Sequence, residues 1–96
     1  KPLARFPAAN RDLALVVPTD VPAGRVVDII ARHRLVERVE LFDVYTGDKI
    51  PAGTKSLAFH VYFQSPAHTL TAEEVDHSLQ SLLRTLEREV GASLRS

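Results

Sequence analysis

The chain has 96 residues, of which 45% are hydrophobic and 25% are charged. These values are typical of one globular domain with a single core, and they exclude a disordered chain. The absence of cysteine excludes a disulfide framework and thiolate chemistry. The longest apolar runs are too short to cross a bilayer, so we expect no membrane partner.

The charges balance, with 12 basic and 12 acidic residues. They are slightly segregated: residues 1–55 carry nine Lys or Arg and seven Asp or Glu, and residues 56–96 carry three and five. A protein that holds nucleic acid mainly by phosphate attraction is normally strongly basic. Any nucleic-acid contact must therefore depend on a few positioned side chains, or take affinity from a larger assembly.

The first third of the chain predicts an arm, a strand and a helix. Residues 1–10 contain two prolines and show no periodicity, which predicts an extended arm. Residues 11–17 alternate between apolar and other side chains, as a half-buried strand does. A helix should follow, with Asp20 as its N-cap and Pro22 in its first turn, and should end near Arg34.

Two further strands are predicted at residues 35–45 and 55–64, the first with a bulge near its start. Their alternation assigns two faces, because successive side chains of a strand point to opposite sides. One face should be buried: Phe42, Val44, Leu57, Phe59, Val61 and Phe63. The other face should be open: Asp43, Tyr45, Ser56, Ala58, His60 and Tyr62.

The second helix has the clearest boundaries in the sequence. Thr71 and Glu74 form a capping box, and an apolar stripe then runs from Val75 to Val90. Gly91 is the expected C-cap residue, and residues 92–95 suffice for one short final strand.

The order strand, helix, strand, strand, helix, strand predicts an α+β fold of the ferredoxin-like βαββαβ type. We expect one domain over residues 1–96, with a four-stranded antiparallel sheet. Each helix has one apolar stripe, so both should pack on the same side of the sheet. The other side is left bare, as in the common RNA-recognition modules, which stack bases on an open sheet face.

Enzymatic motifs are missing from the sequence. The four glycines are isolated, and the four histidines lack the spacing of metal ligands, so we expect no catalytic, cofactor-binding or metal-binding residue. An acylphosphatase-like activity would need an anion-cradling loop after the first strand. Residues 18–22 instead contain an acid and two prolines, which lack N–H donors.

The predicted open face carries an unusual combination of a carboxylate, a phenol and a hydroxyl. Asp43 can accept hydrogen bonds from the N1–H and N2–H₂ donors of guanine, a pair that adenine lacks. Tyr45 can stack on that base, Ser56 can add a hydrogen bond, and the small Ala14 and Ala58 leave room for a ring. The alternative is a merely solvated face, on which Tyr45 covers a neighbouring strand.

Four segments resemble one family, the ferredoxin-fold anticodon-binding domain, in order and with compatible spacing: residues 6–17, 39–47, 53–59 and 69–75. In this family the domain lies at the C-terminal end of the β subunit of bacterial phenylalanine–tRNA ligase, and of the single-chain mitochondrial enzyme. The resemblance spans essentially all 96 residues and implies a fragment of a longer chain.

The resemblance implies that the domain reads the first anticodon base of phenylalanine tRNA, a guanine. Tyr45 would stack on this base, and Asp43 and Ser56 would contact its edge. Arg11 and Lys55 flank the same surface in our interpretation and are candidate contacts to the RNA backbone.

The same resemblance implies the partners and the location of the chain. The partners would be the anticodon loop, the rest of the β subunit and the α subunit, and the location the cytoplasm or, alternatively, the mitochondrial matrix. ATP and magnesium would serve the parent enzyme and not this domain. A regulatory or subunit-interaction module without RNA binding is the alternative function, because ferredoxin-like domains host many functions.

Overall fold

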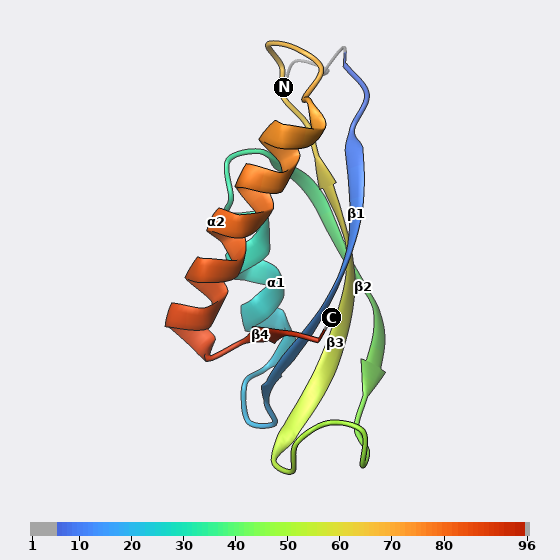
Figure 1. The fold of residues 1–96 in the computed structure, drawn as a ribbon, viewed down its shortest axis with the longest axis vertical. Helices are drawn as coiled ribbons and strands as arrows, with labels where there is room; N and C mark the ends of the chain where they lie inside the picture. Colours follow the sequence, from blue (N-terminus) through green and yellow to red (C-terminus); the bar gives the residue numbers. More distant parts are fainter. Residues whose placement is uncertain (1–5, 96) are drawn as a thin grey trace.

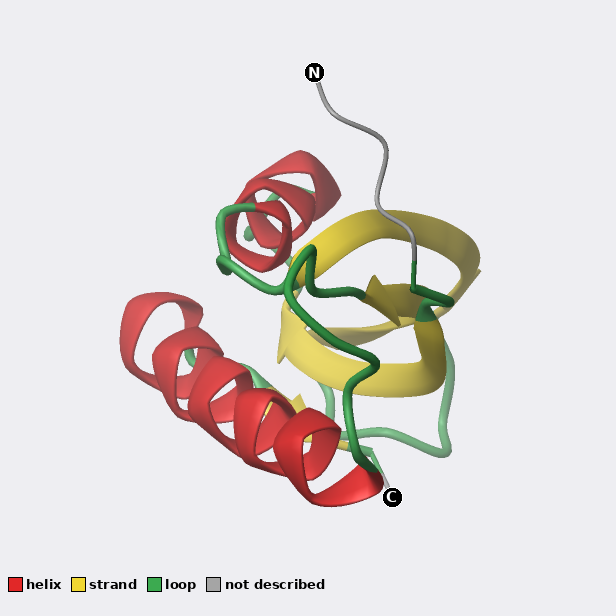
Figure 2. Ribbon diagram, turned by 90° about the horizontal axis from the view of Figure 1, so that it is seen from above, coloured by secondary structure: helices red, strands yellow, loops and turns green. Residues whose placement is uncertain are grey.

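Four antiparallel strands form one sheet in the order β2-β3-β1-β4 in the computed structural model, which describes residues 6–95. The elements follow in the order β1 (Ala9–Pro18), α1 (Ala23–Ala31), β2 (Val36–Tyr45), β3 (Thr54–Phe63), α2 (Ala72–Val90) and β4 (Ser93–Leu94). Both helices lie on one side of the sheet (Figures 1 and 2). This arrangement confirms the predicted ferredoxin-like fold.

The core lies between the sheet and the two helices. The central strands β1 and β3 send alternate side chains into it: Leu13, Leu15, Val17, Leu57, Phe59, Val61 and Phe63. The helices contribute one stripe each, with Val26, Ile29 and Ile30 from α1 and Val75, Leu82, Leu86 and Val90 from α2. Burial of these apolar stripes supplies most of the stability of such elements, because short helices are marginal alone.

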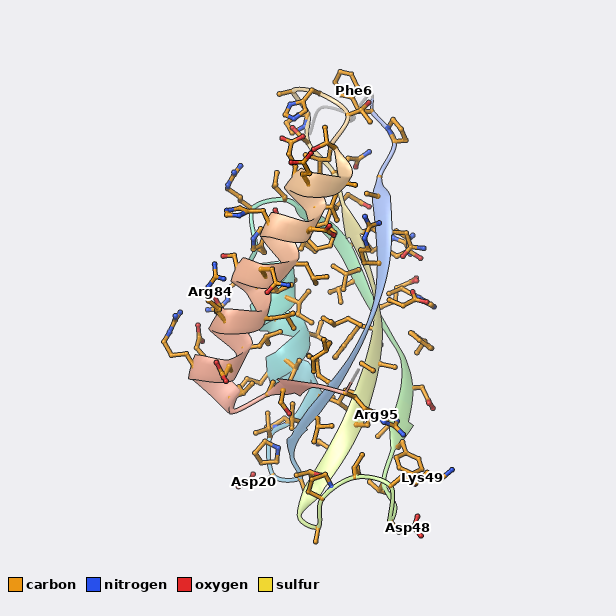
Figure 3. The ribbon with its side chains drawn as sticks, viewed as in Figure 1. Phe6, Asp20, Asp48, Lys49, Arg84 and Arg95 are labelled. Atoms are coloured by element: carbon orange, nitrogen blue, oxygen red, sulfur yellow. The ribbon has the colours of Figure 1, made fainter. Side chains whose placement is uncertain are left out.

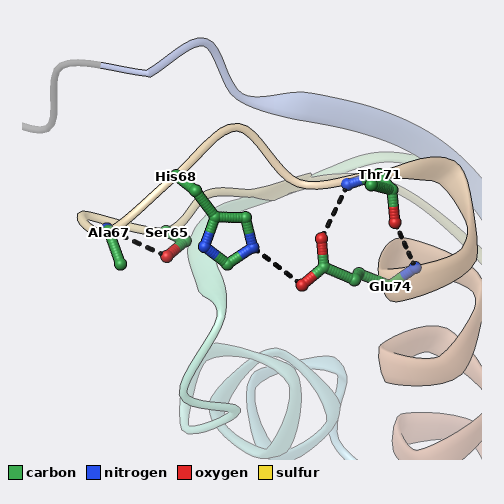
Figure 4. A network of polar contacts seen from close by, with 5 residues as sticks. All are labelled: Ser65, Ala67, His68, Thr71 and Glu74. Atoms are coloured by element: carbon green, nitrogen blue, oxygen red, sulfur yellow. Dashed lines mark hydrogen bonds and ion pairs between the residues drawn. The ribbon is translucent and has the colours of Figure 1, made fainter.

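The ends of α2 are as predicted. Thr71 Oγ1 accepts from the Glu74 amide at 3.1 Å, and the Glu74 carboxylate accepts from the Thr71 amide at 2.9 Å. His68 Nε2 lies 2.8 Å from the other carboxylate oxygen, so one glutamate joins the loop to the helix (Figure 4). Gly91 ends the helix with a φ of 70°, a value that glycine adopts without strain. Neither helix among the described residues combines the length and apolar character needed to span a membrane.

Helix α1 differs from its prediction at both ends. The prediction that Asp20 caps this helix is wrong: Pro22 is the N-cap and makes no side-chain capping bond. The reason is a turn, in which the Val21 amide donates to the Pro18 carbonyl at 3.0 Å and draws Asp20 away from the helix. The last helical residue is Ala31, three residues before the predicted end.

The predicted arm is shorter than expected, because β1 already begins at Ala9. Residues 1–5 of that arm lie outside the described residues. At its described end, the Phe6 carbonyl accepts a hydrogen bond from the Gln64 side chain, which ties the start of the chain to the end of β3.

The assignment of Phe42 to the buried face is wrong. The pairing of β2 with β3 shifts between Leu41 and Asp43, so Phe42 is the extra residue of a bulge. Its ring is 51% exposed and stacks on His60 of the helix-free face, with centroids 3.9 Å apart and planes 9° apart. Val44 pairs with the buried Leu57, as expected, but is itself exposed because β2 is an edge strand.

Candidate nucleic-acid interface

Asp43, Tyr45 and Ser56 lie together on the helix-free face, and we call this group the tyrosine site. Tyr45 is paired with Ser56 across β2 and β3, and Asp43 is paired with Ala58. Paired residues of neighbouring strands point to the same side, and so do residues two apart on one strand. The structure therefore brings these three predicted residues together.

The Asp43 side chain is available to a ligand. This residue is exposed, and it makes no hydrogen bond or ion pair with any residue in the described range 6–95. An ionised carboxylate offers two acceptor oxygens and no donor. The site therefore presents a strong acceptor for a ligand with two adjacent N–H groups.

Arg95 is a member of this site that the sequence analysis missed. Its Cζ atom lies 4.9 Å from the centroid of the Tyr45 ring, and its Nη1 atom donates to Ser56 Oγ at 3.3 Å. The Arg95 amide also donates to the Ala14 carbonyl at 2.8 Å, which extends the pairing of β4 with β1. Figure 3 shows Arg95 beside the end of β2, near the turn that carries Asp48 and Lys49.

The position of Arg95 controls access to Ser56. With Arg95 in place Ser56 is only 3% exposed, whereas Tyr45 is partly exposed. The Ser56 hydroxyl accepts from Arg95 and is almost fully buried, so Asp43 and Tyr45 are the accessible members of the site.

A pocket of about 310 Å³ lies next to the tyrosine site on the same face. Its lining consists of Asp12, Leu13, Ala14, Phe42, Ala58 and Leu94. The small Ala14 and Ala58 leave the space that was predicted for a flat ring. Phe42 and Leu94 border it with large apolar side chains that are about half exposed.

Further along the same face, charged and aromatic side chains pair with one another. His60 Nδ1 lies 2.6 Å from an Asp12 carboxylate oxygen, and the Tyr62 hydroxyl donates to Glu40 at 3.2 Å. Arg38 packs over the Tyr62 ring at 4.0 Å. Tyr62 lies six residues from Ser56 on β3, which corresponds to roughly 20 Å along a strand. The Tyr62, Glu40 and Arg38 group therefore lies away from the tyrosine site, whereas the His60–Asp12 pair borders the pocket next to it.

The structure does not bring Arg11 and Lys55 onto the helix-free face. Arg11 is paired with Val61 and Lys55 with Val17, and both partners are buried on the helix side of the sheet. Arg11 also lies five residues along β3 from Ser56 in register, or roughly 16 Å. Its guanidinium donates to the neighbouring Asn10 carbonyl at 3.0 Å. The two cations therefore do not share the face of the tyrosine site, and a contact of either one with the RNA backbone stays a prediction.

The groups with clearly shifted pKa values lie elsewhere in the described part of the chain. Burial, and then the charge of Arg34, lowers the pKa of His33. Hydrogen bonds from the Thr71 amide and from His68 lower the pKa of Glu74. Residues 6–95 contain no group of three or more His, Cys, Asp or Glu side chains that could hold a metal ion.

A ferredoxin-like sandwich whose bare sheet face carries a carboxylate, a phenol and a pocket resembles in architecture the domains that bind single-stranded nucleic acid on an open sheet. The model of one family, the ferredoxin-fold anticodon binding domain, matches residues 4–95. The chain belongs to this family.

The curated relatives are much longer than the chain. It is 48% identical to the phenylalanine–tRNA ligase beta subunit of Dehalococcoides mccartyi strain CBDB1, over 99% of its own length and 12% of that protein. The corresponding subunit of Moorella thermoacetica is 47% identical with the same coverage, and that of Anaeromyxobacter dehalogenans is 42% identical. The chain thus spans about one eighth of the relatives that it matches.

Proposed function

We propose that this domain reads a guanine, the first anticodon base of phenylalanine tRNA, at the tyrosine site. The observation that supports the proposal is the placement of an unpaired Asp43 and a partly exposed Tyr45 side by side on the helix-free face. Membership of an anticodon-binding family supplies the class of ligand.

The chemistry of the site favours guanine over adenine. The two Asp43 oxygens accept from N1–H and N2–H₂ of guanine, whereas adenine presents an acceptor at N1. Tyr45 stacks on the base, and stacking and a bidentate base contact are each worth about 1–3 kcal/mol. Ser56 is almost fully buried and already accepts a hydrogen bond from Arg95, so we expect its contribution to be the smallest of the three.

Affinity for the whole tRNA must come from outside this chain. Base contacts specify, whereas phosphate contacts supply much of the affinity, and this chain has no net charge. In our proposal the chain is part of the β subunit of a phenylalanine–tRNA ligase that acts with an α subunit. The rest of that enzyme holds the tRNA and uses ATP and magnesium, in the bacterial cytoplasm or, as the alternative, in the mitochondrial matrix.

The proposal is tested by an NMR titration of the ¹⁵N-labelled chain with two anticodon stem-loops that differ only in having guanine or adenine first. We expect weak binding, because the cost of association consumes most of the contact energy. Guanine should nevertheless shift the amides around Asp43 and Tyr45 at lower RNA concentrations.

Tyr45→Ala should weaken this response by roughly fivefold or more, which is the loss of one stacked base. Tyr62→Ala is the matched control, because it removes the other tyrosine of the same face. Equal responses to the two stem-loops, or a larger effect of the control, would contradict the proposal.

A further inference from the structure

Gly47 lies directly against the Tyr45 ring. It follows Tyr45 by two residues, in the connection between β2 and β3. A Cβ atom at Gly47 would lie 2.7 Å from Tyr45 Cζ and 3.3 Å from Cε1, and closest of all to the phenol oxygen. Real Cβ atoms essentially never come within 3.0 Å of a heavy atom outside their own residue and its two chain neighbours. The ring thus occupies the space that the side chain of any other residue would need.

The backbone does not require glycine at this position. The glycines with positive φ are Gly53 at 79° and Gly91 at 70°, and Gly47 is not among them. Alanine can therefore adopt the backbone conformation of residue 47 without the strain that a left-handed position imposes. The close approach of Tyr45 means that the ring must shift if residue 47 carries a side chain.

The Tyr45 ring also has Arg95 as a neighbour within the tyrosine site. The Arg95 guanidinium lies 4.9 Å from the ring centroid and is bonded to Ser56, which is opposite Tyr45 on β3. A ring that is pushed off Gly47 changes its position relative to Arg95 and Ser56. This changes the surface that would receive a base.

We propose that Gly47 is a positioning residue, which sets the orientation of the Tyr45 ring before RNA arrives. This inference rests on the proposed function of the tyrosine site and adds a residue to it. A ring that is already oriented loses less conformational freedom on binding than a mobile one. Gly47→Ala should therefore weaken RNA binding through Tyr45, although residue 47 itself touches no base.

The experiment compares Gly47→Ala with Gly24→Ala in the 96-residue chain. Gly24 is the matched control, because nothing lies within 4 Å of its Cβ position. In the free proteins, we would record NOEs between residue 47 and the Tyr45 ring and the amide shifts of Ser56 and Arg95. With the guanine-first stem-loop at low salt, we would measure dissociation constants with Tyr45 present and in a Tyr45→Ala background.

We expect Gly47→Ala to weaken binding by at least roughly fivefold when Tyr45 is present, as loss of a stacked base would. The same change should have no further effect in the Tyr45→Ala background, and Gly24→Ala should bind like the wild type. Wild-type affinity of Gly47→Ala, or the same loss in both backgrounds, would overturn the inference.

The two proposals fail in different ways. A wild-type chain that does not respond to the guanine-first stem-loop overturns the proposed function. In that case the NMR measurements on the free proteins still test whether Gly47 positions the Tyr45 ring. Absence of NOEs between Gly47 and the Tyr45 ring overturns the positioning role, whereas their presence, with shifted Ser56 and Arg95 amides in Gly47→Ala, supports it.

Discussion

Replacement of Asp43 by asparagine should relax the choice between guanine and adenine. An amide presents one acceptor and one donor. It can therefore pair with the N1–H and O6 of guanine or, after a flip, with the N1 and N6–H₂ of adenine. The carboxylate of Asp43 fits only the guanine edge, because it has no donor. Asp43→Asn should lower the affinity for guanine and bring the two bases closer together.

The expected loss of discrimination between guanine and adenine follows from the exposure and contacts of Asp43. Asp43 is exposed and has no hydrogen bond or ion pair among residues 6–95, so the substitution should change the free energy of unfolding by less than about 0.5 kcal/mol. Hydrogen bonds to a charged group are worth about 1.5–3 kcal/mol and neutral ones about 0.5–1.5 kcal/mol. At an exposed site the lower values apply, so we expect a loss of about 1–2 kcal/mol in discrimination, or roughly five- to thirtyfold.

The assay is the same pair of NMR titrations with guanine-first and adenine-first stem-loops, together with urea unfolding of both proteins. Asp43→Glu is a useful companion, because it keeps the charge and moves it by one methylene group. If Asp43→Asn keeps the wild-type ratio of the two affinities, Asp43 does not read the base edge. If it instead destabilises the fold by more than about 1 kcal/mol, Asp43 has a structural role that the exposed position does not explain.

Three further predictions concern stability. Thr71→Ala should lower the free energy of unfolding by about 1 kcal/mol, because it removes the capping bond of α2, and urea unfolding would show this. Phe42→Ala should lower the free energy of unfolding by less than about 1.5 kcal/mol, because the half-exposed ring loses mainly its stack on His60. Phe59→Ala removes a fully buried ring and should lower it by about 3–5 kcal/mol. Equal losses in the two variants would contradict the bulge at Phe42. Burial, with Arg34 second, lowers the pKa of His33 below 6.5, so its contribution to stability is complete above pH 6.5 and is lost as the pH falls through the folded-state pKa. His33→Gln should flatten that part of the pH profile of urea unfolding, and an unchanged profile would exclude His33 as the cause.

The parts of the fold that the sequence predicts well are those with local causes. Alternation along β1 and β3 depends on the two-residue repeat of a strand, and the buried faces of both strands agree with it. The capping box of α2 depends on residues three apart in the chain, and it is formed as predicted. The same alternation places Arg11 with Leu13 on the helix side of the sheet, and the register of β1 with β3 agrees with it.

The features that the sequence does not predict depend on strand register, on a competing turn or on distant partners. The bulge at Phe42 adds one residue to β2, and alternation alone cannot show where such an insertion falls. Asp20 has the chemistry of an N-cap, but a turn closed by Pro18 and Val21 removes it from the helix. Arg95 reaches the site only because β4 pairs with β1, at the opposite end of the chain.

If the proposed function holds, the charge of the site implies a division of roles between this domain and the rest of a longer ligase subunit. A carboxylate near RNA is repelled by the phosphates, so in this proposal Asp43 would reduce non-specific attraction while it accepts hydrogen bonds from one base edge. Arg95 is the cation that the described structure places on Tyr45, and it is already bonded to Ser56. A site built in this way discriminates between bases more than it holds the RNA. This agrees with a chain that has no net charge and spans about one eighth of its relatives, whose remaining length offers surface for the phosphate contacts.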